Sequence, residues 1–457
     1  MAAYGNTQIQ MPNLNRLTSE ATVFRRACVT QPVCTPSRSS ILTGLYPHTT
    51  GCKADNTILP TDIPCLPEML PKGSCTTGYY GKWHLGDEVF RQHGFDEWRS
   101  IQDDYRRHYR PGRDRGERST YHHFLVENGF DPGDGNTFDN MACTKFPEDF
   151  SKTAYLAREA SRFIRDNRSR PFALFVGFHE PHPPYHGPRD DQYDPSEIKL
   201  PDNFFHPPTE EQHPKAIHRY RAFCERGYRQ WNLRDEGEWR ELISNYWGLC
   251  SQVDTHVGTI LDTLRECGIY DDTIIVFTAD HGDMLGSHRL LQKSVMFHES
   301  IMVPLIIKLP GQERSLTIDG PVSHADLVPT ILDSMGEDIP GYLQGESLLP
   351  VMEGEACVGD GAVTEWNTRE SDGEHEIENE ATAAKRDPTR TIVTPDGWRF
   401  TCSPLGRHEL YNLEEDPIEI HNLAKSGEYS DLMKDLLGRI RAWQKRTGDD
   451  VELPSSF

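Results

Sequence analysis

Short apolar runs recur along the chain and change abruptly into polar segments. Such runs cover residues 171–178, 273–278 and 303–307. Each run is too short for an isolated buried helix, so we predict buried strands. The first two lead directly into segments that hold histidine and aspartate, which is typical of parallel strands, because functional residues gather at their carboxyl ends. The pattern predicts an α/β fold with a large, mostly parallel sheet.

Helical periodicity marks the segments expected to flank this sheet. Apolar residues recur at steps of three and four over residues 150–164 and 246–264, as on the buried face of a helix. Residues 39–43, followed by Gly44, predict a helix with a glycine stop, whose backbone amides point toward the preceding residues. A closing amphipathic helix is expected over residues 432–443.

The composition changes near Gly354. Residues 371–386 are polar, acidic and poor in apolar side chains, which is typical of an exposed loop. Residues 391–402 are expected to form strands. We therefore predict a large domain over residues 1–355 and a smaller C-terminal α+β subdomain over residues 356–457, with a small antiparallel sheet and the closing helix.

The charge of the chain limits its partners. A formal net charge of -23 and a pI near 5.3 argue against nucleic acid or an anionic membrane surface as the main partner. No apolar run is long enough to span a bilayer, and Met1 does not begin a signal peptide. The oligomeric state stays open.

One basic stretch interrupts this acidic chain. It is broken by proline and glycine, which predicts a loop, and it contains Arg106, Arg107, His108, Arg110, Arg113, Arg115 and Arg118. Two interpretations stay open: a solvated run of charges, or an electropositive rim that attracts an anionic polymer.

Five segments carry the chemistry. Residues 34–38 read CTPSR, and the later segments read GKWHLG at 81–86, PHPPY at 181–185, ADHGD at 279–283 and ELYNL at 409–413. A free cysteine is usually only a small buried residue, so the first segment alone is weak evidence. In this order, the five segments resemble the landmarks of type I sulfatases, in the alkaline phosphatase-like superfamily, over essentially the whole chain.

This resemblance implies a modified nucleophile at Cys34. In the family, a formylglycine-generating enzyme oxidises the cysteine at this place to formylglycine, and the hydrated aldehyde attacks the sulfur of a sulfate ester. Arg38 is expected to hold the diol and neutralise charge. On an extended segment Lys82 and His84 share a face, with Trp83 packed on the other side. The resemblance implies that Lys82 contacts the sulfate group and that His84 accepts the proton of the second hydroxyl.

Two further catalytic residues follow from the resemblance. His182, in a loop stiffened by prolines, is expected to donate a proton to a sulfate oxygen or to the leaving group. Lys293 is expected to clamp the sulfate as a point charge. The neighbouring His179 and His186 are expected to be loop or rim residues.

A metal site is expected around Asp280, with calcium as the ion and magnesium as the alternative. The resemblance assigns Asp280, His281 and the modified Cys34 to this ion. A histidine is less typical of calcium than an oxygen donor, so His281 has a second interpretation, contact with the diol or sulfate. Asp283 and His288 are expected to support the structure.

The start of the chain departs from the family pattern. In relatives, an apolar strand that ends in two metal-binding aspartates precedes a segment like residues 4–17. Here Met1 falls after that strand, so we expect the chain as given to lack an interior strand and two carboxylates, and to bind calcium weakly. Export to the periplasm or outside the cell is expected if the true N-terminus carries a signal peptide.

The predicted function is a sulfuric ester hydrolase that acts on a sulfated carbohydrate or an aryl sulfate. Two alternatives remain. The first is a phosphonate monoester or phosphodiester hydrolase of the same superfamily, although Lys82, His84, His182 and Lys293 favour sulfate. The second is an inactive descendant that binds a sulfated ligand. The expected partners are the sulfated substrate and the formylglycine-generating enzyme.

Overall fold

The computed structural model describes residues 1–355, 359–367 and 380–455. The strands in these ranges are β1 (Thr22–Cys28), β2 (Thr76–Gly81), β3 (Glu97–Arg99), β4 (Phe172–Gly177), β5 (Ile275–Thr278), β6 (Met302–Lys308), β7 (Leu316–Ser323), β8 (Ala362–Glu365), β9 (Arg390–Val393), β10 (Trp398–Cys402) and β11 (Glu409–Asn412). The α-helices are α1 (Pro12–Thr18), α2 (Cys34–Thr43), α3 (Pro47–Thr50), α4 (Leu66–Met69), α5 (Thr120–Glu127), α6 (Asn140–Cys143), α7 (Lys152–Asn167), α8 (Pro214–Arg226), α9 (Glu236–Glu266), α10 (His298–Ile301), α11 (Leu327–Ser334), α12 (Leu349–Met352), α13 (Glu380–Arg386) and α14 (Ser430–Thr447).

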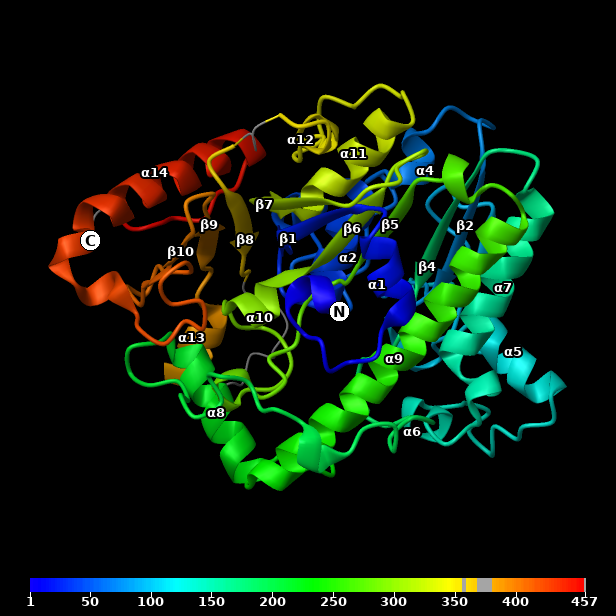
Figure 1. Ribbon diagram of the computed structural model, residues 1–457, viewed down its shortest axis with the longest axis horizontal. Helices are drawn as coiled ribbons and strands as arrows, with labels where there is room; N and C mark the ends of the chain where they lie inside the picture. Colours follow the sequence, from blue (N-terminus) through cyan, green and yellow to red (C-terminus); the bar gives the residue numbers. More distant parts are fainter. Residues whose placement is uncertain (356–358, 368–379, 456–457) are drawn as a thin grey trace.

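These strands form three sheets. One is parallel, in the order β3-β2-β4. The second has the order β5-β6-β1-β7, and in it β6 runs antiparallel to both of its neighbours while β1 and β7 are parallel. The third is antiparallel, in the order β11-β10-β9-β8. Figure 1 shows this third sheet with α14 at one end of the long axis, and β2 and β4 with α5 and α7 at the other. The predicted α/β fold with a smaller C-terminal α+β part is confirmed. The expectation that residues 273–278 form a parallel strand is wrong, because β5 pairs antiparallel with β6.

The predicted elements are present with shifted boundaries. The three apolar runs form β4, β5 and β6, and the two periodic segments lie in α7 and α9. Helix α2 begins at Cys34, earlier than expected, because Pro36 is tolerated in a first turn, where its missing N–H has no helical partner. It ends at Thr43 and is capped by Gly44, which has a φ of 68°.

One loop prediction is partly wrong. Residues 380–386, expected as loop, form helix α13. The rest of that predicted loop, residues 371–379, lies outside the described residues, as does the predicted domain boundary at residue 356.

Strands β4 and β5 each have one free edge in the described part of the chain. β4 pairs only with β2, and β5 pairs only with β6. All residues of both strands are half-buried, whereas β8 and β9 are buried throughout. An unpaired strand edge leaves backbone N–H and C=O groups without partners. Both free edges belong to strands that lead directly to the predicted catalytic segments.

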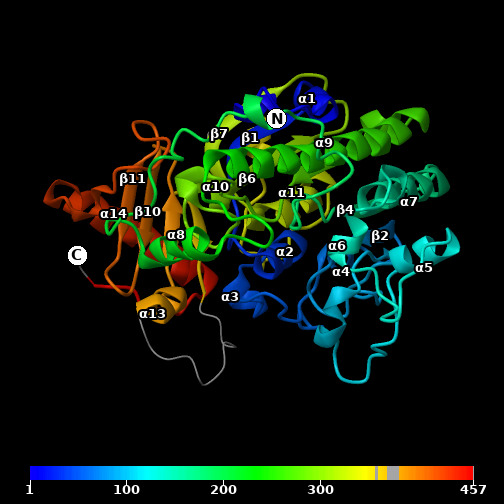
Figure 2. The same cartoon turned by 90° about the horizontal axis from the view of Figure 1, so that it is seen from below.

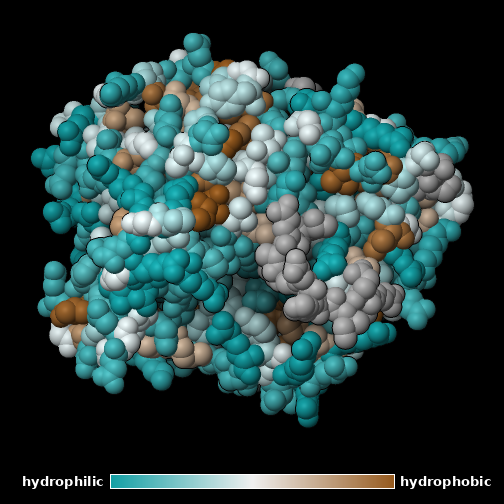
Figure 3. Space-filling view, turned by 180° about the vertical axis from the view of Figure 1, so that it is seen from behind, coloured by the Kyte–Doolittle hydropathy of each residue, from teal (hydrophilic) through white to brown (hydrophobic). Residues whose placement is uncertain are grey.

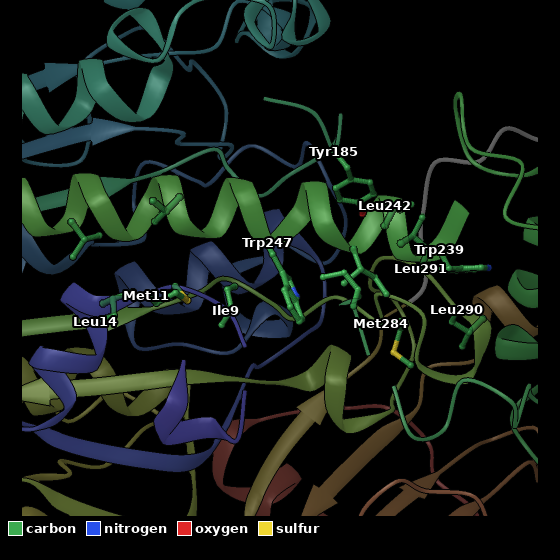
Figure 4. Close-up of a cluster of buried hydrophobic side chains, with 14 of the residues drawn as sticks. Ile9, Met11, Leu14, Tyr185, Trp239, Leu242, Trp247, Met284, Leu290 and Leu291 are labelled. Carbon is green, nitrogen blue, oxygen red and sulfur yellow. The ribbon is translucent and has the colours of Figure 1, made fainter. Parts of the chain in front are cut away.

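The largest apolar cluster lies between α9 and the N-terminal segment (Figure 4). Trp247 of α9 points toward Ile9 and Met11 in this view. Polar contacts fix the same junction, because the Asp254 carboxylate accepts hydrogen bonds from the backbone N–H groups of Asn13 and Leu14, 3.1 and 2.7 Å away. These bonds satisfy donors at the start of α1 that have no partner within the helix.

The C-terminal sheet packs against α14 and lies beside α8 and α10 (Figure 2). Buried ion pairs help to join it to the rest of the molecule, as in the pairing of Glu419 with Arg399 and His298. None of the helices in the described ranges is both long and apolar enough to span a membrane. Hydrophilic residues cover most of the face in Figure 3, with scattered apolar ones.

Candidate active site

Cys34 is the first residue of α2, and its side chain is 1% exposed. Three cationic or ionisable groups surround its Sγ: Lys293 Nζ at 2.9 Å, His281 Nε2 at 3.2 Å and Lys82 Nζ at 3.6 Å. Burial raises the pKa of the Cys34 thiol, but the charges of Lys293, Lys82 and His281 outweigh burial and hold this pKa well below its usual value. The pocket therefore stabilises negative charge at this atom.

The end of β2 places Lys82. Gly81 has a φ of 124°, and a Cβ there would clash with the carbonyl oxygen of Gly177, so the two strands approach closely only with glycine. The Lys82 N–H donates to the same carbonyl, 2.9 Å away. Lys82 is 2% exposed, and Trp83 is fully buried in an aromatic cluster. The strand junction thus delivers Lys82 to the pocket.

His84 reaches the pocket in a different way from the one predicted. Its φ is 60°, so Lys82 and His84 are not neighbours on one extended face. The buried carboxylate of Glu88 holds the turn by accepting from the N–H groups of Trp83 and His84, at 2.8 and 2.7 Å. Even so, a ring nitrogen of His84 lies within 4.8 Å of Cys34 Sγ.

Asp55 and Asn56 also line the pocket, although neither belongs to a motif recognised in the sequence. An Asp55 carboxylate oxygen lies within 4.8 Å of Cys34 Sγ and of a His84 ring nitrogen. The Thr35 N–H donates to Asp55 Oδ1 over 3.3 Å, and His84 Nε2 lies 3.1 Å from Asn56 Oδ1. Hydrogen bonds to the start of α2 therefore tie this loop to the site.

Arg38 forms an ion pair with Asp280, with Nε and Oδ2 2.8 Å apart. Its Nη1 also donates to the carbonyl oxygen of Lys82 over 2.7 Å. Burial lowers the pKa of Arg38, but Asp280 outweighs burial and raises it. Burial likewise raises the pKa of Asp280, and the charges of His281 and Arg38 bring it far below its usual value. Both groups are therefore ionised.

His182 is neutral and has a fixed tautomer. Its Nδ1 donates to the Pro183 carbonyl oxygen over 2.7 Å, so Nε2 carries the lone pair. Burial, and then the charge of Lys82, hold the pKa of His182 well below its usual value. His179, expected to be a loop or rim residue, lies in the loop after β4 but is not at the rim. It is only 6% exposed, because it packs against His182 with 4.6 Å between ring centroids and bonds to Gln102.

The residues predicted for the metal lie together. Ligand atoms of Cys34, Asp280 and His281 are all within 4.8 Å of one another. His281 Nδ1 donates to the Gly282 carbonyl oxygen over 2.8 Å, so in the neutral ring the Nε2 lone pair faces Cys34 and Asp280. Calcium takes six to eight oxygen ligands. A single carboxylate that is already paired with Arg38 does not by itself fit calcium.

Asp283 and His288 hold the surrounding loops, in line with the structural role expected of them. Asp283 accepts hydrogen bonds from the Tyr185 hydroxyl at 2.9 Å and from the Gln292 N–H at 2.8 Å. It therefore joins the segment that holds His182 to the residue before Lys293. His288 is buried, and its Nδ1 donates to the His206 carbonyl oxygen over 2.7 Å.

The basic stretch is largely used within the fold. Arg110 and Arg113 both pair with Asp87, at 2.9 and 3.3 Å, and the Asp87 carboxylate is fully buried. Arg106 donates to the carbonyl oxygen of Asp103 over 2.9 Å. These three arginines have partners in the protein, whereas Arg107 and Arg115 are exposed, so the stretch is neither wholly a free basic rim nor a fully solvated charge run.

Comparisons with known proteins identify the family. The family model for sulfatases matches residues 1–337. The chain belongs to the sulfatase family. A second model, described as the C-terminal part of N-sulphoglucosamine sulphohydrolase, matches residues 286–446. Membership makes the chain a hydrolase and confirms the family that the five sequence segments indicated.

Relatives and solved structures cover nearly the whole chain. The chain is 29% identical to the choline-sulfatase of Rhizobium meliloti over 432 residues, which cover 92% of this chain and 78% of the relative. It is 26% identical to the ulvan-active sulfatase of Formosa agariphila over 467 residues, 98% and 79% of the two chains. The phosphonate monoester hydrolase of Silicibacter pomeroyi has a similar fold, with a TM-score of 0.81, 23% identity and coverage of 98% and 93%.

Proposed function

We propose that this enzyme hydrolyses sulfate esters of carbohydrates or aryl alcohols, with a nucleophile formed when Cys34 is oxidised to formylglycine. The observation that carries the proposal is the convergence of Lys82, Lys293 and His281 on Cys34 Sγ within 3.6 Å. The hydrated aldehyde supplies an oxygen nucleophile for attack on sulfur. Groups that stabilise a thiolate at this point also stabilise an anionic oxygen there.

The remaining site residues have roles that suit this reaction. Lys82 and Lys293 neutralise the oxygens of the sulfate group, and Arg38 holds Asp280 in place. His84, beside the position of Cys34, accepts a proton from the nucleophile's hydroxyl. His182 Nε2 has no hydrogen-bond partner among the described residues and carries the lone pair of the neutral ring, so it must take up a proton before it can donate to the leaving group as expected.

A divalent cation, calcium or magnesium, is proposed to complete the site and supply positive charge beside the nucleophile. Asp280, His281 and the Cys34-derived group would hold it. The described residues contribute one carboxylate to this set, so further oxygen ligands are required. No step of the proposed reaction depends on this ion.

Phosphonate monoester hydrolysis is the second candidate, and the structural likeness to the Silicibacter pomeroyi enzyme favours it.

To test the two candidates, the chain is expressed with a formylglycine-generating enzyme, and the mass of the peptide that contains Cys34 is measured. Hydrolysis of p-nitrophenyl sulfate is then compared with that of p-nitrophenyl phenylphosphonate. We expect conversion of the thiol to an aldehyde and a preference for sulfate.

Three results contradict the proposal in different ways. Full activity in a Cys34→Ala variant excludes the nucleophile. A preference for the phosphonate supports the second candidate. If Cys34 is converted to formylglycine and the protein binds sulfate esters but hydrolyses neither compound, the protein is an inactive descendant.

A further inference from the structure

The aromatic ring of Tyr105 covers one face of His84. Tyr105 belongs to a 3-10 helix, η2 (Asp104–His108), which follows β3. The two rings are stacked, with 4.3 Å between their centroids and 26° between their planes. His84 is only 6% exposed, and its Nε2 lies against Asn56. The stack and this bond together restrict how the imidazole can turn.

The hydroxyl of Tyr105 belongs to the same pocket as the nucleophile. Burial raises the pKa of this hydroxyl, and the negative charges of Cys34, Glu88 and Asp55 raise it further, while Lys293 acts in the opposite direction. The hydroxyl is therefore neutral, and the ring that carries it lies on His84, a ring nitrogen of which is within 4.8 Å of Cys34 Sγ.

The Tyr105 hydroxyl has no hydrogen-bond partner in the described ranges. Tyr105 is half-buried, and its hydroxyl oxygen is not among the atoms sealed from solvent. Two other tyrosines near the site differ in this respect. The Tyr79 hydroxyl donates to the Lys82 carbonyl oxygen over 2.5 Å, and the Tyr185 hydroxyl donates to Asp283 over 2.9 Å. Tyr105 keeps both a donor and an acceptor available to a ligand.

We propose that Tyr105 is a substrate-positioning residue that selects sulfate esters with a hydroxyl group beside the ester oxygen. Its ring holds His84 against the nucleophile, and its hydroxyl hydrogen-bonds the neighbouring hydroxyl of the leaving alcohol. The substrate class is then the sulfate ester of a vicinal diol, as in carbohydrates. This inference rests on the proposed sulfate-ester hydrolysis.

Two aryl sulfates test the contact. 4-Nitrocatechol sulfate carries a hydroxyl next to the sulfate ester, and p-nitrophenyl sulfate does not. In Tyr105→Phe, the ratio of kcat/KM for 4-nitrocatechol sulfate to that for p-nitrophenyl sulfate is expected to fall about tenfold, the size of one net hydrogen bond. In Tyr105→Leu, which also removes the stack, kcat is expected to fall for both esters.

The matched control is Tyr109→Phe. Tyr109 lies just beyond η2, is 3% exposed and packs on Phe90, and its buried hydroxyl has no partner in the described part of the chain. Its loss is expected to leave the ratio unchanged. The proposal is overturned if Tyr105→Phe gives the same ratio as the unaltered enzyme, or if Tyr109→Phe lowers the ratio equally.

A binding measurement separates this inference from the proposed function. In a Cys34→Ala background, calorimetric titration with the two esters is expected to show about tenfold weaker binding of 4-nitrocatechol sulfate when Tyr105→Phe is added. If the converted enzyme hydrolyses neither ester, the proposed function fails, and the titration still decides the role of Tyr105. The imidazole NMR signals of His84 are expected to shift in Tyr105→Leu and to change less in Tyr105→Phe; equal shifts overturn the role of the ring.

Discussion

His298 is expected to make the stability of the fold depend on pH above neutrality. Its Nδ1 lies 3.0 Å from Glu419 and 3.4 Å from Glu299. Burial lowers the pKa of His298, but Glu299 and Glu419 outweigh burial and raise it from 6.5 to about 9. Arg399 pairs with the same Glu419 from the other side. The protonated imidazole therefore helps to join α10 to the C-terminal part.

The raised pKa sets both the sign and the size of the effect. A proton that binds more tightly in the folded state stabilises it fully below pH 6.5, and this stabilisation is lost as the pH rises through about 9. One pKa unit corresponds to about 1.4 kcal/mol. Because the His298 side chain is 29% exposed, solvent screening reduces the stabilisation that corresponds to its whole pKa shift to about 2 kcal/mol. For 457 residues this corresponds to about 2 °C in Tm.

Scanning calorimetry from pH 6 to pH 10 on the unaltered chain and on His298→Gln measures the effect. Glutamine keeps a hydrogen-bond donor near Glu419 and cannot titrate. We expect the variant to be less stable at pH 6 and to converge with the unaltered chain near pH 10. Parallel curves over the whole range refute the reasoning, because they mean that His298 has the same pKa in the folded and unfolded states.

Two further predictions concern the charged loop and the free strand edges. Replacing Arg110 and Arg113 by alanine leaves the buried carboxylate of Asp87 without its cationic partners, although the N–H of residue 110 still donates to it, so we expect about 1–3 kcal/mol of destabilisation and equal losses on a sulfated polysaccharide and an aryl sulfate. Unchanged thermal unfolding with a raised KM for the polysaccharide alone contradicts this, and the exposed Arg107 provides the control. In a second variant, an apolar strand that ends in two aspartates is added to the N-terminus. The added strand is expected to pair with the free edges of β4 and β5. The extended chain is then expected to melt at a higher temperature and to bind calcium more tightly. Identical melting and calcium binding in the two chains rule this out.

Sequence motifs predicted which residues meet at the site, but not how each one gets there. Lys82, His281 and Lys293 each follow a motif, and all three surround Cys34 as expected. The conformation of His84 depends on the buried carboxylate of Glu88, four residues later in the chain. A spacing of two residues cannot show that contact, so an extended segment was the natural prediction and was wrong.

Loop residues without a motif were beyond prediction. Asp55 and Tyr105 lie far apart in the sequence and enter the pocket only because tertiary contacts bring their loops to α2 and to His84. The arginine stretch shows the same limit. Its charges were plain in the sequence, yet their role depends on Asp87, a single carboxylate buried beneath the loop. Composition gives the charge of a segment, whereas burial decides whether that charge serves the fold or the ligand.

The balance of charge at the site argues for an anionic substrate group. The ion pair of Arg38 with Asp280 largely cancels itself. Lys82, Lys293 and His281 then face the nucleophile, opposed by the Asp55 carboxylate near the same atoms. An uncharged ester would leave this buried positive charge uncompensated, which is costly. A sulfate ester and a phosphonate monoester each carry one negative charge at neutral pH and suit the site equally in this respect, so the comparison of p-nitrophenyl sulfate with p-nitrophenyl phenylphosphonate, and not the charge, separates the two candidates.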